Sequence, residues 1–312
     1  MKQRYTWKGL AIFGLVFCVL LAVFSVPFYQ YLELGYQYQD IKAKSDIIQN
    51  EEDTTFDALF LGDSQGWSTY SPIQMYGEYG FTSYNACTAG QFPYDASILL
   101  KNFYKTKKTN LVVVDVNMVF TSVNFLKLGL MWIFPIFHYH NVDELSSLQD
   151  YSSKKGFNEY DGSLGYTGSL NYMEENEKSD LIRYDCSKAL EDIYELCKEN
   201  NSQLLLVNTV SPLHWNQKRH DKIQKWCEEH NVNYVDYNET SLNQQIGFDY
   251  STDFRDGGDH LNLSGSKKVC AYLGSYLQTT YELEDHRKDE KYQAWNQLYN
   301  ELLNIMAYDI IL

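Results

Sequence analysis

The 312-residue sequence predicts a three-layer α/β/α domain built on a central parallel sheet. Short apolar segments alternate with longer amphipathic ones, as is typical of βαβ units. Two of the short segments, 111–114 and 204–207, are continuously apolar, so their strands are expected to be buried on both faces. The predicted strands are 56–61, 111–116, 203–208 and 232–237, and the predicted helices are 97–104, 181–200, 214–230 and 264–280.

The amino-terminal segment predicts a membrane anchor. Residues 9–29 carry no charge, and the preceding residues 1–8 include Lys2, Arg4 and Lys8. About 20 apolar residues in a helix cross a hydrocarbon core of ~30 Å, whereas the apolar region of a signal peptide is typically ~7–15 residues long. Positively charged flanks stay in the cytoplasm, so the rest of the chain is expected to be extracytoplasmic. A cleaved signal sequence is the alternative.

The chain after the anchor predicts one catalytic domain with an insertion. Residues 30–53 are expected to form a juxtamembrane stalk or short helix, followed by the α/β domain over 54–284. The alternation of strands and helices stops across 121–180, which predicts an insertion there. Its apolar run, 125–137, could pack on the core, cap the site, lie at a membrane interface or dock a partner. Residues 285–312 predict a carboxyl-terminal amphipathic helix.

Composition limits the classes of partner. A formal net charge of −15 argues against nucleic acid, which needs clustered Lys and Arg, and suits solubility outside the cell. Of the six cysteines, Cys18 lies in the predicted span, so the other five cannot all pair within one chain. Buried thiols and disulfides both remain open. No metal-ligand spacing or cofactor motif is present, and we expect neither a metal nor a cofactor.

A Gly62-Asp63-Ser64 turn directly follows the predicted strand 56–61. This places Ser64 at the carboxyl end of a buried strand, where a serine nucleophile can be presented. The motif alone is weak, because these residue types are common. A serine also needs a base to accept its proton, and the base needs a carboxylate to orient it. Near the other end of the chain, a glycine-rich loop supplies His260 with nearby carboxylates.

Two further blocks lie between the serine and the histidine. Gly90 follows a short segment at 83–89, and Asn117 follows the apolar strand 111–116. Serine, glycine, asparagine and histidine in this order resemble the four blocks of the SGNH hydrolases, also called the GDSL family. The resemblance implies that Ser64 is the nucleophile and His260 the base. It also implies an oxyanion hole formed by the backbone N–H groups of Ser64 and Gly90 and the side-chain amide of Asn117, each donor contributing roughly 3 kcal/mol.

The last block departs from the family pattern in its carboxylate. The family usually has aspartate three residues before the histidine, but that position is Gly257 here. Asp256 lies four residues before His260 and Asp259 one before. We favour Asp256 as the orienting carboxylate, because Asp259 would have to fold back on its neighbour. The third block departs as well, because Asn117 matches only in its position after the strand.

Three functions are consistent with the sequence. The resemblance is closest to membrane-anchored SGNH proteins that acylate bacterial glycans or wall polymers (DltD-like) beside a polytopic membrane O-acyltransferase. It implies a Ser64–His260–Asp256 acyltransferase that acts on an acyl donor and a cell-surface polysaccharide. A GDSL-type carbohydrate esterase would use the same residues. A catalytically silent glycan-binding or scaffold protein is the third hypothesis, favoured if Asp256 cannot reach His260.

Overall fold

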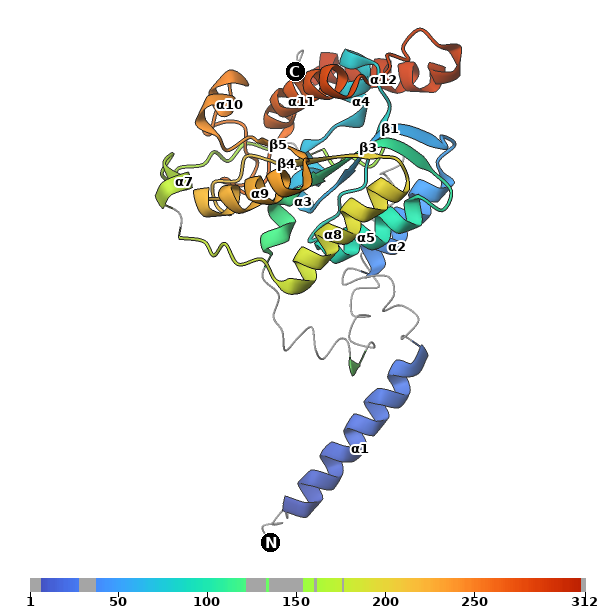
Figure 1. Ribbon diagram of the computed structural model, residues 1–312, viewed down its shortest axis with the longest axis vertical. Helices are drawn as coiled ribbons and strands as arrows, with labels where there is room; N and C mark the ends of the chain where they lie inside the picture. The colour runs from blue at the N-terminus through green and yellow to red at the C-terminus, as the bar shows by residue number, and fades with distance from the viewer. Residues whose placement is uncertain are drawn as a thin grey trace.

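The computed structural model describes residues 7–27, 38–121, 133–134, 154–159, 162–175 and 177–309. Its centre is a five-stranded, all-parallel sheet in the order β2-β1-β3-β4-β5, which confirms the predicted fold class (Figure 1). The strands are β1 (Thr55–Leu61), β2 (Ser83–Asn85), β3 (Lys108–Asp115), β4 (Gln203–Asn208) and β5 (Asn233–Asp236). Only β2 was not predicted, since its three residues are too short for a periodic signal.

Helices cover both faces of the sheet and form the outer layers (Figure 1). One face is covered by α2 (Tyr38–Asn50), α5 (Pro93–Phe103), α8 (Tyr184–Glu199) and α9 (Gln217–His230), and the other by α3 (Ser64–Thr69), α4 (Pro72–Tyr79) and α11 (Leu263–Tyr281). Shorter elements are η2 (Val116–Phe120), α7 (Tyr172–Glu175), α10 (Thr240–Gln245) and η5 (Glu290–Tyr292). The helix predicted from residue 214 begins at Gln217, because the Asn216 side chain caps it by accepting from the Arg219 N–H at 3.0 Å.

Alternate side chains of each strand enter opposite cores. In β3, Val112 and Val114 pack toward the α2, α5 and α8 side, whereas Leu111 and Val113 pack toward the α11 side. The same alternation holds in β4. Because side chains of a strand point alternately to the two faces, a continuously apolar strand can be buried on both.

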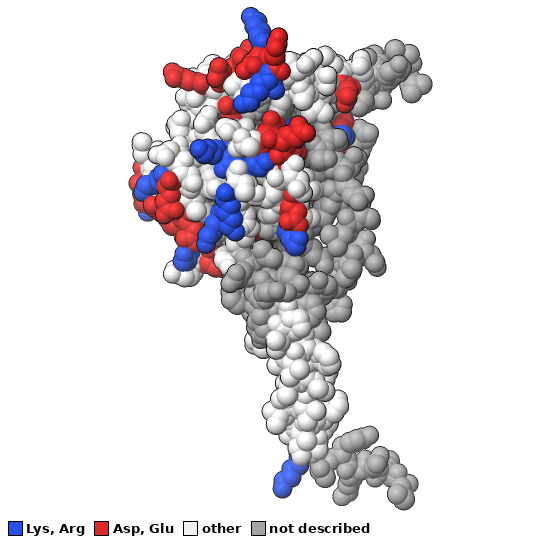
Figure 2. Space-filling model, turned by 90° about the vertical axis from the view of Figure 1, so that its right-hand side faces the viewer, with Lys and Arg blue, Asp and Glu red and all other residues white. Residues whose placement is uncertain are grey.

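The amino-terminal helix α1 (Trp7–Ser25) is the one helix in the described part of the chain that is long and apolar enough to cross a membrane. By length and composition it fits either a single-pass anchor or a signal sequence. In Figure 2, charged side chains of both signs are scattered among uncharged ones over the described part of the α/β unit, and they are nearly absent from the described part of the α1 helix. Part of the predicted stalk over 30–53 is folded as α2, which buries Ile41 and Ile48 in the main core. The juxtamembrane segment is therefore partly built into the α/β unit.

The described parts of the predicted insertion, 121–180, support the domain. Two backbone hydrogen bonds fix this segment beside β2 and α3: the Asn85 N–H donates to Lys155 O at 2.9 Å, and the Asn158 N–H donates to Trp67 O at 3.1 Å. The apolar run 125–137 lies outside the described residues except for 133–134. The carboxyl-terminal helix α12 (Gln293–Asp309) begins within the predicted range 285–312 and buries Trp295, whose Nε1–H donates to Asp53 Oδ2 at 3.0 Å.

All six cysteines are free thiols in this structure. Cys18 is exposed on α1, and the other five are buried. Burial raises the pKa of the Cys270 thiol to about 12, so this sulfur is protonated and unreactive at neutral pH.

Candidate active site

Ser64 is the first residue of α3, directly after the turn that leaves β1. The side chain of Asp63 caps this helix by accepting from the Gln65 N–H at 3.0 Å. Gly62 is required for a reason other than the sharp turn expected from the sequence. A Cβ at Gly62 would lie 2.8 Å from the Cβ of Asp115, so a side chain there would push β1 away from the end of β3. Glycine thus allows the serine turn to pack closely on the neighbouring strand end.

His260 lies within hydrogen-bond distance of the predicted nucleophile. Its Nε2 is 2.8 Å from Ser64 Oγ, across 196 positions of sequence. Its Nδ1 is 2.6 Å from Asp256 Oδ2, and its backbone N–H donates to Asp256 Oδ1 at 2.8 Å. With Nδ1–H donating to Asp256, Nε2 carries the lone pair that accepts the Ser64 hydroxyl hydrogen. The structure therefore brings Ser64, His260 and Asp256 into one hydrogen-bonded chain.

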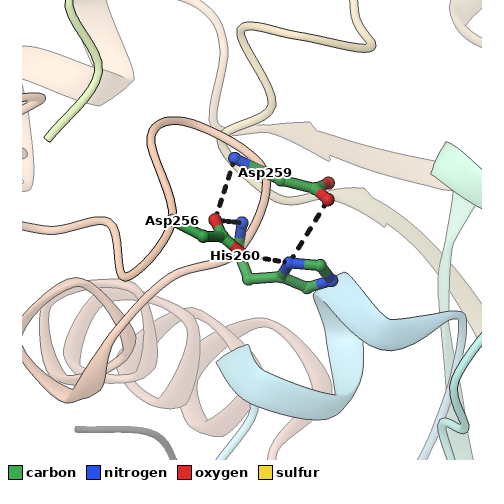
Figure 3. Close-up of side chains that lie close together, drawn as sticks. All are labelled: Asp256, Asp259 and His260. Carbon is green, nitrogen blue, oxygen red and sulfur yellow. Dashed lines mark hydrogen bonds and ion pairs between the residues drawn. The ribbon is translucent and has the colours of Figure 1, made fainter. Parts of the chain in front are cut away.

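The loop that holds His260 explains how a carboxylate four residues earlier reaches its ring. Gly257 and Gly258 adopt positive φ values of 83° and 114°, a conformation that other residues rarely adopt. The extra residue relative to the family pattern is therefore accommodated by a bend, and Asp256 turns back toward His260 (Figure 3). The described part of the insertion is hydrogen-bonded to this loop and stabilises its conformation. The Leu164 N–H donates to Phe254 O at 3.1 Å, and the Gly257 N–H donates to Leu164 O at 2.7 Å.

Asp259 also reaches the imidazole, at a longer distance. Its Oδ2 lies 3.4 Å from His260 Nδ1, as Figure 3 shows. Its Oδ1 is 3.0 Å from His214 Nε2 and accepts from Gln65 Nε2 at 3.2 Å. Burial would raise the pKa of Asp259, but the bond to His214, the nearby His260 and the bond from Gln65 outweigh burial and lower the pKa to about 2. Asp259 is therefore a fixed negative charge beside the base.

Sequence reasoning missed His214 and Gln65. His214 was assigned to the helix predicted over 214–230, but it lies in the turn before α9 and after the carboxyl end of β4. Residues that follow the carboxyl ends of parallel strands meet at one edge of the sheet. That rule, applied to β4 as it was to β1 and β3, would have placed His214 near Ser64.

A buried polar network lies beneath the serine. Asn117 links two carboxylates, because its Nδ2 donates to Asp63 Oδ2 at 3.3 Å and its backbone N–H donates to Asp115 Oδ1 at 3.1 Å. Asp115 also accepts from the Tyr70 hydroxyl at 2.6 Å. Burial, reinforced by the charge of Asp63, raises the pKa of Asp115 to about 7, and burial likewise raises the pKa of Asp63. Asp115, the last residue of β3, is thus a central member of this network.

The predicted oxyanion donors are placed unequally. Asn117 lines the same cavity as Ser64, and one of its two amide hydrogens is bonded to Asp63, which leaves the second for a ligand. Gly90 lies on an exposed turn with φ of 60°, and the described residues that line this cavity do not include it. The role of Gly90 stays a prediction from the family resemblance.

The same side chains could offer ligand atoms to a metal ion. Asp256, Asp259 and His260 have such atoms within 4.8 Å of one another. Both ring nitrogens of His260 are already hydrogen-bonded, to Asp256 and to Ser64. These contacts explain the close approach of the three side chains without a metal ion: His260 is a base that lies between its carboxylates and the serine.

Neither a protein-family model nor a curated protein matches the chain. Similar solved structures include a candidate platelet activating factor from Streptococcus pneumonia, with 13% identity and a TM-score of 0.44 over 82% of this chain and 99% of the other. A GDSL-like lipase from Bacteroides thetaiotaomicron has 12% identity and a TM-score of 0.38 over 77% and 98%. A lipase/acylhydrolase from Enterococcus faecalis has 12% identity and a TM-score of 0.38 over 73% and 97%.

Proposed function

We propose that this protein is a membrane-anchored serine acyltransferase that forms an acyl-enzyme on Ser64 and passes the acyl group to a hydroxyl of a cell-surface polysaccharide or wall polymer outside the cytoplasm. The observation that carries the proposal is the hydrogen-bonded chain from Asp256 through His260 to Ser64, at 2.6 and 2.8 Å. The apolar helix α1, preceded by positively charged residues, supports an anchored, outward-facing domain. A polytopic membrane O-acyltransferase is the proposed partner that supplies acyl groups.

The chemistry follows from the proton path. Ser64 Oγ attacks the acyl carbonyl carbon while its proton moves to His260 Nε2, and Asp256 stabilises the imidazolium that forms. The oxyanion is stabilised by the Ser64 N–H, the Asn117 amide and, on the family resemblance, the Gly90 N–H. The leaving alcohol takes the proton from His260. An acceptor hydroxyl then gives its proton to His260 as its oxygen attacks the acyl-enzyme carbonyl. The bond from the carbonyl carbon to Ser64 Oγ breaks, His260 returns the proton to Oγ, and the new ester is released.

A carbohydrate esterase is the second candidate, because water can replace the acceptor hydroxyl in the last step. The arrangement around Ser64 serves both reactions equally. The silent scaffold hypothesis depended on Asp256 failing to reach His260, and the 2.6 Å separation of Asp256 Oδ2 and His260 Nδ1 speaks against that condition.

The test uses the full chain in detergent micelles. A fluorophosphonate probe should label the wild-type protein and fail to label Ser64→Ala, while Ser275→Ala, an exposed serine on α11, should label like wild type. Near-wild-type acyl turnover by a folded Ser64→Ala variant would overturn the nucleophile assignment. For a labelled protein, acetyl release is then measured with and without a carbohydrate acceptor. Transfer to the acceptor supports an acyltransferase, and release to water at the same rate in both supports an esterase.

A further inference from the structure

The cavity beside Ser64 is unusual for this acidic chain because several cations line it. The cavity has a volume of about 600 Å³, within the range of small-ligand sites. Its lining includes the cations Lys178, Arg183 and Arg219 and the imidazole of His214, against the carboxylates Asp63 and Asp259. The whole chain carries a net charge of −15, so this cationic lining is a local feature.

Arg219 is the member whose environment points to a ligand. Its side chain emerges from the first turn of α9, and the residue is only 8% exposed. Its Nε–H donates to the Ser179 carbonyl at 2.7 Å, and Nη1 donates to the His214 carbonyl. Its guanidinium lies 4.8 Å from the ring centre of Phe120. The head group is thus held in one orientation by two backbone carbonyls and an aromatic face.

No carboxylate of the described residues lies within 4.0 Å of the Arg219 guanidinium, and none of them accepts a hydrogen bond from its Nη2. Buried arginines are normally paired, because an uncompensated charge in a poorly hydrated place is costly. Burial lowers the pKa of Arg219 to about 10, against the weaker opposing effect of Asp180, and the side chain still stays charged at neutral pH. A charged, oriented guanidinium that lies in a cavity wall and pairs with no carboxylate of the described residues is suited to bind an anion.

The nearby acids are engaged elsewhere and do not neutralise Arg219. Asp180 forms an ion pair with Lys222 at 3.0 Å. Asp259 is bonded to His214 and Gln65 and lies beside His260. The described acids near Arg219 are therefore bound to other partners, and its guanidinium is available to an anionic group of a substrate.

Arg219 is connected to the reacting serine through a short series of contacts. Arg219 holds the His214 carbonyl, the His214 ring contacts Asp259 at 3.0 Å, and Asp259 lies 3.4 Å from the His260 ring that contacts Ser64. Ser64 and Arg219 also line the same cavity, so one substrate molecule in that cavity can place its ester at Ser64 and another group at Arg219.

We propose that the serine cavity selects an anionic ester, in which a carboxylate or phosphate near the acyl linkage is bound by the Arg219 guanidinium. This inference rests on the proposed function of Ser64 and specifies the substrate class of that site. The anion can belong to the acyl group or to the alcohol, as on an acidic polysaccharide, and both sources share the same recognition chemistry. A planar guanidinium fork binds two oxygens of such a group at once.

The test compares anionic esters with their neutral methyl esters, using the full chain in detergent. The three pairs are mono-4-nitrophenyl succinate, 4-acetoxybenzoate and 4-acetoxyphenyl phosphate with their methylated forms, so that acyl-side carboxylate, alcohol-side carboxylate and phosphate are separated. The readout is the ratio of kcat/KM for the anionic ester to that for its neutral form. We expect a wild-type ratio of about tenfold or more for at least one pair, since a charge-assisted hydrogen bond contributes on that scale. Ratios near one for all three pairs would overturn the proposal.

Variants assign the preference to Arg219. Arg219→Gln should lower the ratio by about tenfold, whereas Arg219→Lys, which keeps the charge without the fork, should retain an intermediate ratio. The matched control is Lys218→Gln, which removes one positive charge from the preceding residue, whose side chain is 66% exposed. An equal loss of the ratio in Lys218→Gln, or an unchanged ratio in Arg219→Gln, would show that the preference is a general charge effect. If Arg219→Gln does not fold, the ratio of Arg219→Lys decides, and a wild-type value there overturns the assignment to Arg219.

A binding measurement separates this inference from the enzyme assignment. Inorganic phosphate should raise the Tm of wild type and of Lys218→Gln more than that of Arg219→Lys, because a ligand that binds the folded state stabilises it. If wild type does not react with the fluorophosphonate, Ser64 is not the nucleophile. The Tm increase with phosphate then still shows whether Arg219 binds an anion. Equal Tm increases in all three proteins would count against the site itself.

Discussion

Two pairs of aspartates flank the Ser64–His260 hydrogen bond, and they occupy opposite environments. Asp63 and Asp115 are buried beneath the serine and joined through Asn117, whereas Asp256 and Asp259 lie on a partly exposed loop beside the histidine. Burial raises the pKa of Asp115 to about 7, while the contacts of Asp259 overcome its burial and lower its pKa to about 2. Burial without a cation favours the protonated acid, and contact with imidazoles and an amide favours the carboxylate.

The difference in pKa between the two pairs of aspartates indicates that they have different roles. The buried pair supports the serine turn through hydrogen bonds. Asp115 accepts from the Tyr70 hydroxyl and from the backbone N–H groups of Asn117 and Thr209. The exposed pair supplies negative charge where an imidazolium forms. A site that needs both a rigid support and a fixed charge obtains them from the same residue type by changing its surroundings.

The largest expected effect comes from Asp256. Asp256→Asn should lower kcat for an aryl ester by about 10³- to 10⁴-fold, because an amide no longer favours the Nδ1–H tautomer that leaves Nε2 free to accept the serine proton. Turnover by the purified full chain measures this. Asp192→Asn, an exposed aspartate on α8, is the control and should retain wild-type turnover. A larger loss in Asp259→Asn than in Asp256→Asn would mean that the closer carboxylate is not the orienting one.

The second expected effect concerns stability and its pH dependence. The folded pKa of Asp115, about 7, lies above the value near 3.9 expected in an unfolded chain. Between these values the folded state binds a proton that the unfolded state releases, so this group costs stability as the pH rises from about 4 to about 7. Asparagine stays neutral throughout. The free energy of unfolding of Asp115→Asn minus that of wild type should therefore increase across this interval, by on the order of a few kcal/mol, and be constant above it.

Denaturant unfolding of both proteins at several pH values gives this difference directly. Carboxylates that do not interact with Asp115 cancel in the subtraction, and the difference includes the effect of Asp63, whose charge contributes to the raised pKa of Asp115. A difference that stays flat from pH 4 to pH 7 would show that Asp115 ionises like an exposed aspartate. The contrast between the buried and the exposed pair would then have no energetic basis.

The sequence predicted the sheet well and the site in part. The long apolar strands were found because burial on both faces leaves a continuous pattern in one-dimensional sequence, as in 111–114 and 204–207. The three-residue β2 and the six-residue α3 were missed because both are shorter than the segments, about 4–8 residues for a strand and 11–18 for a helix, over which a periodic pattern is recognised. The stalk expected over 30–53 proved to include a packed helix, since burial of Ile41 and Ile48 depends on tertiary contacts.

At the site, residues with a recognisable local motif were easier to place than those that act through space. Ser64 and His260 stand in recognisable blocks, and the favoured carboxylate, Asp256, contacts the histidine. His214 has no motif, and its contact with Asp259 joins segments 45 positions apart. The sequence placed Gly62 in the turn before Ser64, but its close approach to Asp115 could only be seen once β1 and β3 were side by side.

The smallest expected effect belongs to Asp259, and it tests whether the exposed pair acts as one unit. Asp259 Oδ2 is 3.4 Å from His260 Nδ1, compared with 2.6 Å for Asp256, so it adds charge stabilisation without setting the tautomer. Asp259→Asn should therefore lower kcat by about two- to fivefold, since one partly exposed charge contact contributes up to about 1 kcal/mol. Because the pKa of Asp259 is about 2, the carboxylate stays ionised above pH 4, and the ratio of wild-type to variant kcat should be constant over the pH interval in which kcat of both proteins has reached its plateau. A ratio that changes across this interval would mean that the negative charge at Asp259 is not fixed, and the proposed division between a supporting pair and a charge-carrying pair would fail.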